Sequence, residues 1–250
     1  MSTNATTGNR HIEVCEDKTD LADKAAKHFA KLVNKIAGEK GQVTVALSGG
    51  STPKLLYERL MQSDLKDVIP WNKIQFFVSD ERCVPHDSEE SNWGNANRML
   101  LSPLNIQRAQ LHPTQDQDKD AGISSTTYEI EVRTFVAGGA NGVPSFDIIF
   151  LGMGPDGHTA SLFPDTAGLA EARRLVMKNH VDKLNADRLT FTFTLLNSAA
   201  HVIFLVAGED KAAVLSEVFA NAGKYPVEKV APVQGDATWF IDKAAARSLT

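Results

Sequence analysis

The sequence has few cysteines: only Cys15 and Cys83 occur in 250 residues, and they form no C-x-x-C pair. We therefore expect neither a disulfide framework nor a thiolate metal site. Long hydrophobic runs are also missing, since the longest, such as residues 202–207, are far too short to span a bilayer. The polar opening has no apolar segment of the kind that a secretory signal needs. These absences predict a cytoplasmic protein whose residues 1–10 are disordered.

Positive charge is also scarce: 26 lysines and arginines against 31 acidic residues give a net charge of −5. Such a surface has no general attraction for nucleic acid or for anionic membranes, so we expect neither as a partner. An anionic ligand would have to be held by donors placed around one site, which favours a small molecule. With 42% hydrophobic residues and neither repeats nor a linker, the chain is expected to fold as one domain over residues 1–250.

What the sequence does contain is an alternation of helical patterns and short apolar runs. From Thr19 to Ile36 apolar residues recur every three or four positions, which predicts an amphipathic helix. Residues 188–196 alternate threonine with apolar residues, as in a strand near a sheet edge or lining a cleft. Runs rich in β-branched and aromatic residues predict buried parallel strands at 11–16, 43–48, 74–79, 146–152 and 201–208. Together they predict a doubly wound α/β fold, with helices on both faces of a mostly parallel sheet.

In such folds ligands bind beyond the carboxyl ends of the strands, so the residues that follow each strand are candidates for a site. The strand at 43–48 runs into a Gly-Gly-Ser-Thr turn at 49–52. We interpret Ser51 and Thr52 as N-cap residues and Pro53 as the first helical residue, so that free amides at a helix N-terminus can bind a phosphate or carboxylate. The same turn is equally consistent with a well-capped helix that binds nothing.

The strand at 74–79 is followed directly by Asp80, Glu81 and Arg82. A carboxylate at this rim can orient a sugar hydroxyl or move a proton, and an arginine can bind a phosphate with paired donors. Charged triplets of this kind also occur in solvated turns, and Asn92 nearby is consistent with either a helix cap or a ligand contact.

Residues 152–158, Gly-Met-Gly-Pro-Asp-Gly-His, contain the G-x-G-x-x-G spacing of a dinucleotide-binding turn. Three features argue against a nucleotide: the motif lies far from the first strand of the chain, Asp156 would repel a pyrophosphate, and Pro164 ends any helix after a few residues. We interpret the glycines instead as a sharp bend that presents Asp156 and His158 at the sheet edge. A neutral imidazole is suited to take a proton from water near pH 7.

Asp156 can hold that imidazole in one tautomer or simply cap the turn, and both interpretations stay open. Two cations lie beside later strands: Arg188 opens the run at 188–196, and Lys211 follows the strand at 201–208 where a helix begins. Because a cation at a helix start opposes the helix dipole, Lys211 favours a ligand role, although a solvated lysine fits too. No histidine pair or cluster of histidine with carboxylates has the spacing of metal ligands, so neither a metal nor another cofactor is predicted.

Five blocks of the sequence resemble, in order, the 6-phosphogluconolactonases of the glucosamine-6-phosphate isomerase/6-phosphogluconolactonase family. They are LSGGSTPKLLYERL, SDERCVPHDSEESN, FDIIFLGMGPDGHTASLFPD, RLTFTFTLLNSAAHVIFLVAGEDKAAVL and ATWFIDKAAARSL. The resemblance runs from about residue 11 to the end, and GPDGHTASLFP is its most specific part. It implies a Rossmann-like sheet, metal-free hydrolysis of 6-phosphoglucono-1,5-lactone to 6-phosphogluconate, and a place in the oxidative pentose phosphate pathway.

Carried over residue by residue, the resemblance makes His158 the general base for water, and the loop itself adds Asp156 as the second candidate catalytic residue. Together with the rim carboxylates and the amides of the glycine loop, it implies contacts to substrate from Gly49, Gly50, Ser51, Thr52, Asp80, Glu81, Arg82, Gly154, Arg188 and Lys211. The sequence departs from the family at 182–187, where Asp-Lys-Leu-Asn-Ala-Asp replaces a Pro-rich segment, so the role of Arg188 is carried over less firmly than that of His158.

Two alternatives make different demands on the sequence. The deaminase relatives share the Gly-Gly turn, the Asp-Glu pair and Gly-x-Asp-Gly-His, but they continue to an Asn-Glu-Pro whose glutamate position is Phe163 here, and their tyrosine after Asp-Glu is Arg82. The loss of a proton-handling group favours hydrolysis over isomerisation. A non-catalytic phosphosugar-binding protein would keep the anion-binding turn but has no need of Asp156 or His158.

Overall fold

The computed structural model describes residues 9–114, 120–139 and 142–249. Within these residues a six-stranded sheet has the order β1-β9-β8-β5-β2-β3, and every neighbouring pair is parallel. Its strands are β1 (Asn9–Cys15), β2 (Val43–Leu47), β3 (Ile74–Val78), β5 (Ile148–Leu151), β8 (His201–Val206) and β9 (Asp236–Asp242). The predicted α/β fold with a mostly parallel sheet is therefore confirmed.

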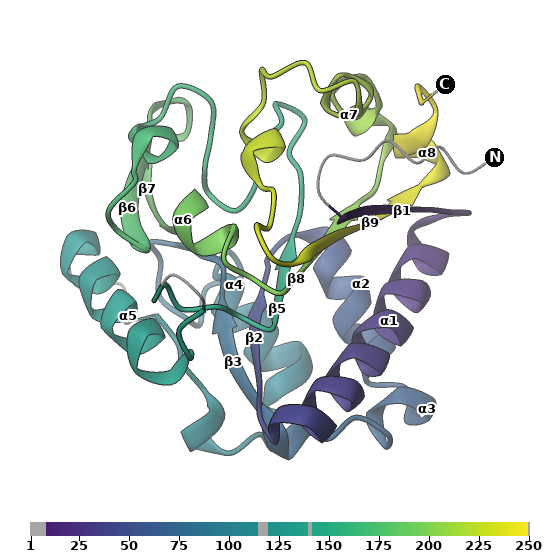
Figure 1. Ribbon diagram of the computed structural model, residues 1–250, viewed down its shortest axis with the longest axis vertical. Coiled ribbons are helices and arrows are strands. Elements are labelled where there is room, and N and C mark those ends of the chain that lie inside the picture. Colours follow the sequence, from purple (N-terminus) through teal and green to yellow (C-terminus); the bar gives the residue numbers. More distant parts are fainter. Residues whose placement is uncertain (1–8, 115–119, 140–141, 250) are drawn as a thin grey trace.

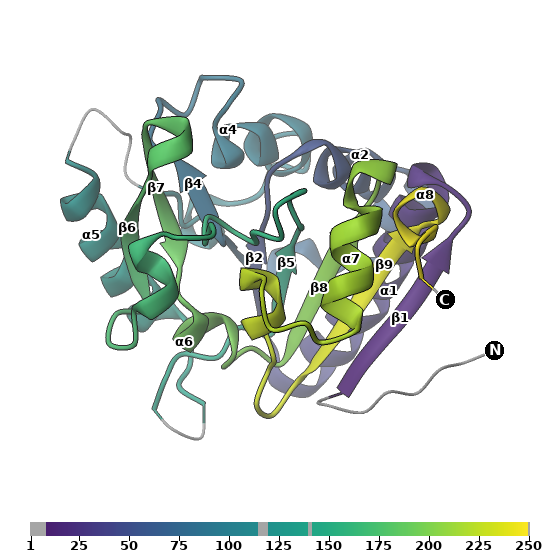
Figure 2. The ribbon, with the colours of Figure 1, turned by 90° about the horizontal axis from the view of Figure 1, so that it is seen from above.

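The sheet is buried on both sides because helices cover both of its faces (Figures 1 and 2). The helices α1 (Lys18–Lys40) and α2 (Ser51–Leu60) pack on one face, and α7 (Ala212–Phe219) and α8 (Lys243–Ala246) lie over the other. All residues of β2 and β5 are buried, which explains why these strands read as unbroken apolar runs rather than alternating ones.

A second sheet, three-stranded and antiparallel, lies beside the first (Figure 2). It has the order β4-β7-β6, formed by β4 (Asp80–Arg82), β7 (Ala186–Phe191) and β6 (Val176–Val181). The expected single strand over 188–196 was wrong in its extent, because β7 ends at Phe191 and Phe193–Leu196 form the short helix α6. Both β6 and β9 are absent from the sequence-based prediction.

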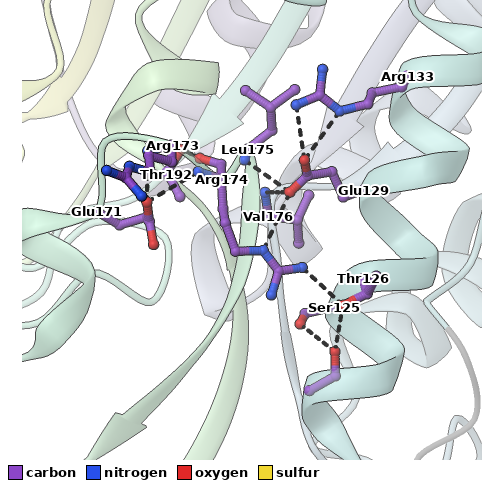
Figure 3. A network of polar contacts seen from close by, with 11 residues as sticks. Ser125, Thr126, Glu129, Arg133, Glu171, Arg173, Arg174, Leu175, Val176 and Thr192 are labelled. Atoms are coloured by element: carbon purple, nitrogen blue, oxygen red, sulfur yellow. Dashed lines mark hydrogen bonds and ion pairs between the residues drawn. The ribbon is translucent and has the colours of Figure 1, made fainter.

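The helix α5 (Ala121–Phe135) packs against β6 and is fixed there by Glu129 (Figure 3). The Glu129 carboxylate accepts hydrogen bonds from the amides of Leu175 and Val176 at 3.0 and 3.2 Å, and it also pairs with Arg133 and Arg174. Burial opposes ionisation of this group, but the hydrogen bonds from Val176, Arg133 and Leu175 prevail and lower its pKa. Glu129 thereby ties a helix to the sheet whose middle strand carries Arg188.

Shorter elements connect these layers. They are the helices α3 (Ser63–Lys66) and α4 (Asn92–Ala96), a π-helical turn at Asn97–Leu101, and 3-10 turns at Trp71–Lys73, Arg108–Gln110, Ala167–Ala170, Asp182–Leu184, Glu209–Lys211 and Pro226–Lys229. Of the ten residues expected to be disordered, 1–8 lie outside the described residues, whereas Asn9 and Arg10 belong to β1, so the prediction was wrong for these two. In the part of the chain that the structure describes, no helix combines the length and the apolar character needed to cross a bilayer.

Candidate active site

The segments singled out in the sequence meet at one edge of the parallel sheet. The turn at 49–52 follows β2, Asp80 follows β3, the loop at 152–158 follows β5, and Lys211 comes shortly after β8. From β2 the next strand, β3, is added on one side of the sheet, whereas from β5 the next strand, β8, is added on the other side. The direction in which strands are added therefore reverses between the neighbouring strands β2 and β5. Open α/β sheets bind their ligands beyond the carboxyl ends of the strands at such a switch point.

Two adjoining cavities open at this edge. The first, of about 400 Å³, we call the amide cavity; it is lined by the turn at 49–52 together with Lys18, Asn92, Gly154, Asp210 and Lys211. The second, of about 460 Å³, we call the arginine cavity; it is lined by Asp156, Ser161, Phe163, Lys183, Leu184 and Arg188. His158, Asp80 and Arg82 line both cavities, so His158 stands where the two meet.

The turn at 49–52 presents unpaired amides to the amide cavity. Gly50 is the N-cap of α2, with φ +104° and no side-chain cap, and Ser51 is the first helical residue. The prediction that Ser51 and Thr52 cap the helix was therefore wrong by one to two positions; the amides of both residues form no hydrogen bond with a described residue. Free amides at the positive end of a helix are suited to an anion.

Gly49 is required by a close neighbour rather than by its conformation. A Cβ placed on Gly49 would lie 1.7 Å from Oδ1 of Asn92, whose Nδ2 donates a hydrogen bond to the carbonyl of Asp80 at 2.9 Å. The Asn92 side chain therefore packs between the turn after β2 and Asp80, which follows β3. The helix-cap interpretation of Asn92 was wrong, because Ser91 is the N-cap of α4 and its hydroxyl accepts the hydrogen bond from the amide of Gly94 at 2.9 Å. Asn92 is the first residue of the helix and lines the amide cavity.

Two lysines bring positive charge to the amide cavity. Lys211 points into it with only 16% of its side chain exposed and forms an ion pair with the adjacent Asp210. Lys18 reaches the same cavity from the first turn of α1, and it forms no ion pair with any residue in the described ranges. The sequence analysis missed Lys18, although it sits at a helix start just as Lys211 does.

The His158 ring is held by Asp156 and Phe163. Its Nδ1 lies 2.6 Å from Oδ1 of Asp156, and its ring stacks on Phe163 with centroids 3.9 Å apart. The second oxygen of Asp156 forms an ion pair with Lys183. Nε2 of His158 makes no hydrogen bond with the described residues, so it faces the cavities available for a proton.

The electrostatics keep Asp156 ionised and His158 neutral. Although burial opposes ionisation of Asp156, its hydrogen bonds to Lys183 and His158 lower the pKa of the carboxyl to about 2. Burial lowers the pKa of His158 and outweighs the opposing attraction of Asp156 and Asp80. An ionised Asp156 accepts a hydrogen bond from Nδ1–H of the neutral ring, which leaves Nε2 as the basic nitrogen. Both open interpretations of Asp156 fit this geometry, because its Oδ1 lies 2.6 Å from Nδ1 of His158 and also accepts a hydrogen bond from the backbone amide of His158 at 3.2 Å.

Gly154 provides space for the His158 ring, but its amide is not free to donate a hydrogen bond to a substrate oxygen. Its amide donates a hydrogen bond to the carbonyl of His158 at 2.9 Å and is not free for a substrate, although Gly154 lines the amide cavity. A Cβ on Gly154 would lie 2.1 Å from two atoms of the His158 ring. The loop therefore needs glycine at 154 so that the imidazole can pack against its backbone.

The two rim carboxylates separate in the folded chain. Asp80 lines both cavities and accepts the hydroxyl of Ser161 at 2.7 Å. Glu81 is fully buried, lines neither cavity, and was therefore placed wrongly at the ligand-facing rim. Burial raises the pKa of Glu81, while four donors stabilise its carboxylate: the amides of Arg82, Asn92 and Trp93 and the hydroxyl of Ser91. Glu81 thus anchors the start of α4.

Arg82 and Arg188 lie directly opposite each other on the antiparallel strands β4 and β7. Like charges in that position destabilise a sheet unless something neutralises them. Arg82 donates to the carbonyl of Glu90 at 2.5 Å and Arg188 to that of Asp187 at 3.0 Å, and neither pairs with a carboxylate among the described residues. Burial and the charge of Arg82 lower the pKa of Arg188. The arginine cavity is therefore a second place suited to an anion.

Comparison with known proteins agrees with this geometry. The family model described as glucosamine-6-phosphate isomerases/6-phosphogluconolactonase matches residues 16–239. The chain belongs to this family. The resemblance drawn from the five sequence blocks is thereby confirmed.

Members of the family resemble the chain over nearly its whole length. A 6-phosphogluconolactonase of Synechocystis is 40% identical and covers 95% of this chain and 98% of its own. The solved 6-phosphogluconolactonase from Trypanosoma cruzi is 29% identical, with a TM-score of 0.88, and covers 99% of this chain and 100% of its own. A monomeric glucosamine-6-phosphate deaminase shares the fold with a TM-score of 0.79 at 18% identity, covering 95% of this chain and 99% of its own.

Proposed function

We propose that this protein hydrolyses 6-phospho-D-glucono-1,5-lactone to 6-phospho-D-gluconate, with His158 as the general base, in the oxidative pentose phosphate pathway. The observation that carries the proposal is the position of His158 between two cavities that are both suited to anions. The substrate has one anionic end, the 6-phosphate, and the reaction creates a second at C1. A site with cationic groups on either side of a base matches that distribution of charge.

The 6-phosphate is assigned to the amide cavity. There the free amides of Ser51 and Thr52 can donate to it, and Lys211 and Lys18 supply charge. A cavity of about 400 Å³ is within the ordinary range for a small-molecule site. With the phosphate fixed there, the lactone carbonyl carbon lies toward His158, so a water molecule and C1 are held together rather than meeting by collision.

The reaction then needs one proton to move twice. Nε2 of His158 takes a proton from the attacking water as its oxygen bonds to C1, while Asp156 stabilises the imidazolium that forms. The negative charge on the former carbonyl oxygen lies beside Arg82 and Arg188. When the bond between C1 and the ring oxygen breaks, the imidazolium returns its proton to that oxygen. The carboxylic acid formed at C1 then releases the second proton of the water to solvent, which leaves the product carboxylate beside the two arginines.

A deaminase function has weaker support in the same geometry. The position that matches the deaminase glutamate is Phe163, and its apolar ring lies flat against His158 at 3.9 Å. A phenyl ring stabilises the packing of the imidazole but cannot transfer a proton. A purely binding function leaves the pairing of Asp156 with His158 without a purpose.

The test follows acid release from freshly generated lactone, with and without the purified protein. His158→Ala should lower kcat by about 10²- to 10⁴-fold, the usual contribution of a general base, while 6-phosphogluconate still binds. His180→Ala is a matched control, since His180 is paired with Asp187 and lines neither cavity. Near-normal turnover in His158→Ala would contradict the assignment, and ammonia release from glucosamine 6-phosphate would favour the deaminase.

A further inference from the structure

The turn at Asp182–Leu184, between β6 and β7, brings a lysine to the arginine cavity. The turn is closed by Asn185 in the left-handed conformation, with φ 44°, and it projects Lys183 over the glycine loop. The ammonium of Lys183 forms an ion pair with Oδ2 of Asp156. It also lies 4.6 Å from the centroid of the Phe163 ring.

Lys183 therefore contacts both groups that hold the imidazole. One oxygen of the Asp156 carboxylate pairs with Lys183, and the other accepts the hydrogen bond from Nδ1 of His158. The lysine therefore fixes the rotation of the carboxylate that orients the imidazole. Phe163 contacts both Lys183 and the His158 ring. An isolated surface ion pair contributes little, and half of the Lys183 side chain is exposed. What distinguishes this lysine is that its two partners act on one base.

We propose that Lys183 is a positioning residue of the lactone-hydrolysing site, which fixes Asp156 and Phe163 against His158 and keeps the imidazole neutral without touching the reacting atoms. The proposal rests on the proposed function and deepens it. The physical basis is that the ammonium offsets the negative charge of Asp156. An imidazole beside an uncompensated carboxylate holds its proton more tightly and is less often available as a base.

The charges around His158 support this direction of effect. Burial is the largest influence and lowers its pKa, Asp156 and Asp80 raise it, and Lys183 lowers it. Apart from Lys183, the arginines and lysines that line the two cavities are unchanged in the variants described next. Tyr225 is a further titratable residue that packs on Gly157 of the same loop, and its hydroxyl donates a hydrogen bond to Glu217.

The experiment compares Lys183→Met, Lys183→Gln and the charge-conserving Lys183→Arg with the wild type. Lys178→Met is a matched control, because Lys178 pairs with Asp187 at 2.8 Å across the same two strands but lines neither cavity. Two readouts are used: the dependence of kcat/KM on pH for lactone hydrolysis, and an NMR titration of the His158 ring. Thermal unfolding verifies that each variant is folded.

Removal of the cation should raise the midpoint of the kcat/KM–pH profile and that of the His158 NMR titration by about half a pH unit to one pH unit. A shift of this size is expected for a charge near a partly exposed group. Lys183→Arg should restore most of the shift, and Lys178→Met should show none. Midpoints that coincide with those of the wild type in both neutral variants would overturn the proposal. If the wild type releases no acid from the lactone, the proposed function fails instead, and the NMR titration still decides whether Lys183 acts on His158.

Discussion

Gly154→Ala should disable the base while leaving most of the protein intact. The added Cβ would lie 2.1 Å from Cε1 and Nδ1 of His158 and 2.8 Å from Oδ1 of Asp156. Carbon atoms in ordinary contact are about 3.5 Å apart, so the imidazole has to retreat by about 1.4 Å. That movement pulls Nδ1 away from its carboxylate and Nε2 away from the position proposed for the attacking water. A displacement of about 1 Å in a catalytic group can cost about 10²-fold in rate.

The assay measures kcat/KM for lactone hydrolysis together with the free energy of unfolding in urea. We expect kcat/KM to fall by about 10²-fold, which corresponds to about 2.7 kcal/mol of transition-state stabilisation. Because a quarter of the His158 side chain is exposed, the ring can swing outward and the fold should persist. Gly38→Ala in α1, where a Cβ meets nothing within 4 Å, is the control and should retain full activity. Activity of folded Gly154→Ala within twofold of the wild type would refute this reasoning.

Three further predictions concern binding, pH and stability. Lys211→Met should raise KM by about 10- to 100-fold with little change in kcat, because it removes a charge-assisted contact to phosphate, and inhibition by 6-phosphogluconate should weaken equally. Burial lowers the pKa of His158, so kcat/KM should stay level through neutral pH and reach its acid midpoint below 6.5; a midpoint near 7 would argue against this base. Glu129→Gln should lower the free energy of unfolding at pH 7 by about 1.5–3 kcal/mol, measured in urea. Since the folded pKa of Glu129 is lowered, that difference should be complete above the unfolded value of about 4.3 and shrink as the pH falls through the folded one.

Much of the fold could be predicted from local patterns. Four strands are short apolar runs with polar or glycine-rich ends: β2, β3, β5 and β8. Because they are buried on both faces, their own composition is enough to identify them as strands. Strand β6 was missed because it alternates buried and exposed residues, among them a lysine and a histidine, on a sheet with one open face. Such a strand owes its stability to pairing with β7 rather than to its own composition.

The positions of the candidate site residues along the chain follow from local sequence patterns. Because the carboxyl ends of parallel strands share one edge, a glycine turn after one strand and a Gly-Pro-Asp-Gly-His loop after another had to face the same cavities. The pairing of Asp156 with His158 is also local, since two residues separated by one glycine in a tight loop can reach each other.

The directions of the remaining side chains depend on contacts between distant segments. Glu81 and Arg82 are adjacent in sequence, yet one is buried beneath α4 and the other lines both cavities. Arg82 meets Arg188 because β4 pairs with β7 across more than a hundred residues, and Lys183 reaches Asp156 because the same sheet places its turn over the glycine loop. These contacts depend on strand register and sheet packing, which join distant segments and leave no signal in the spacing of residues along one of them.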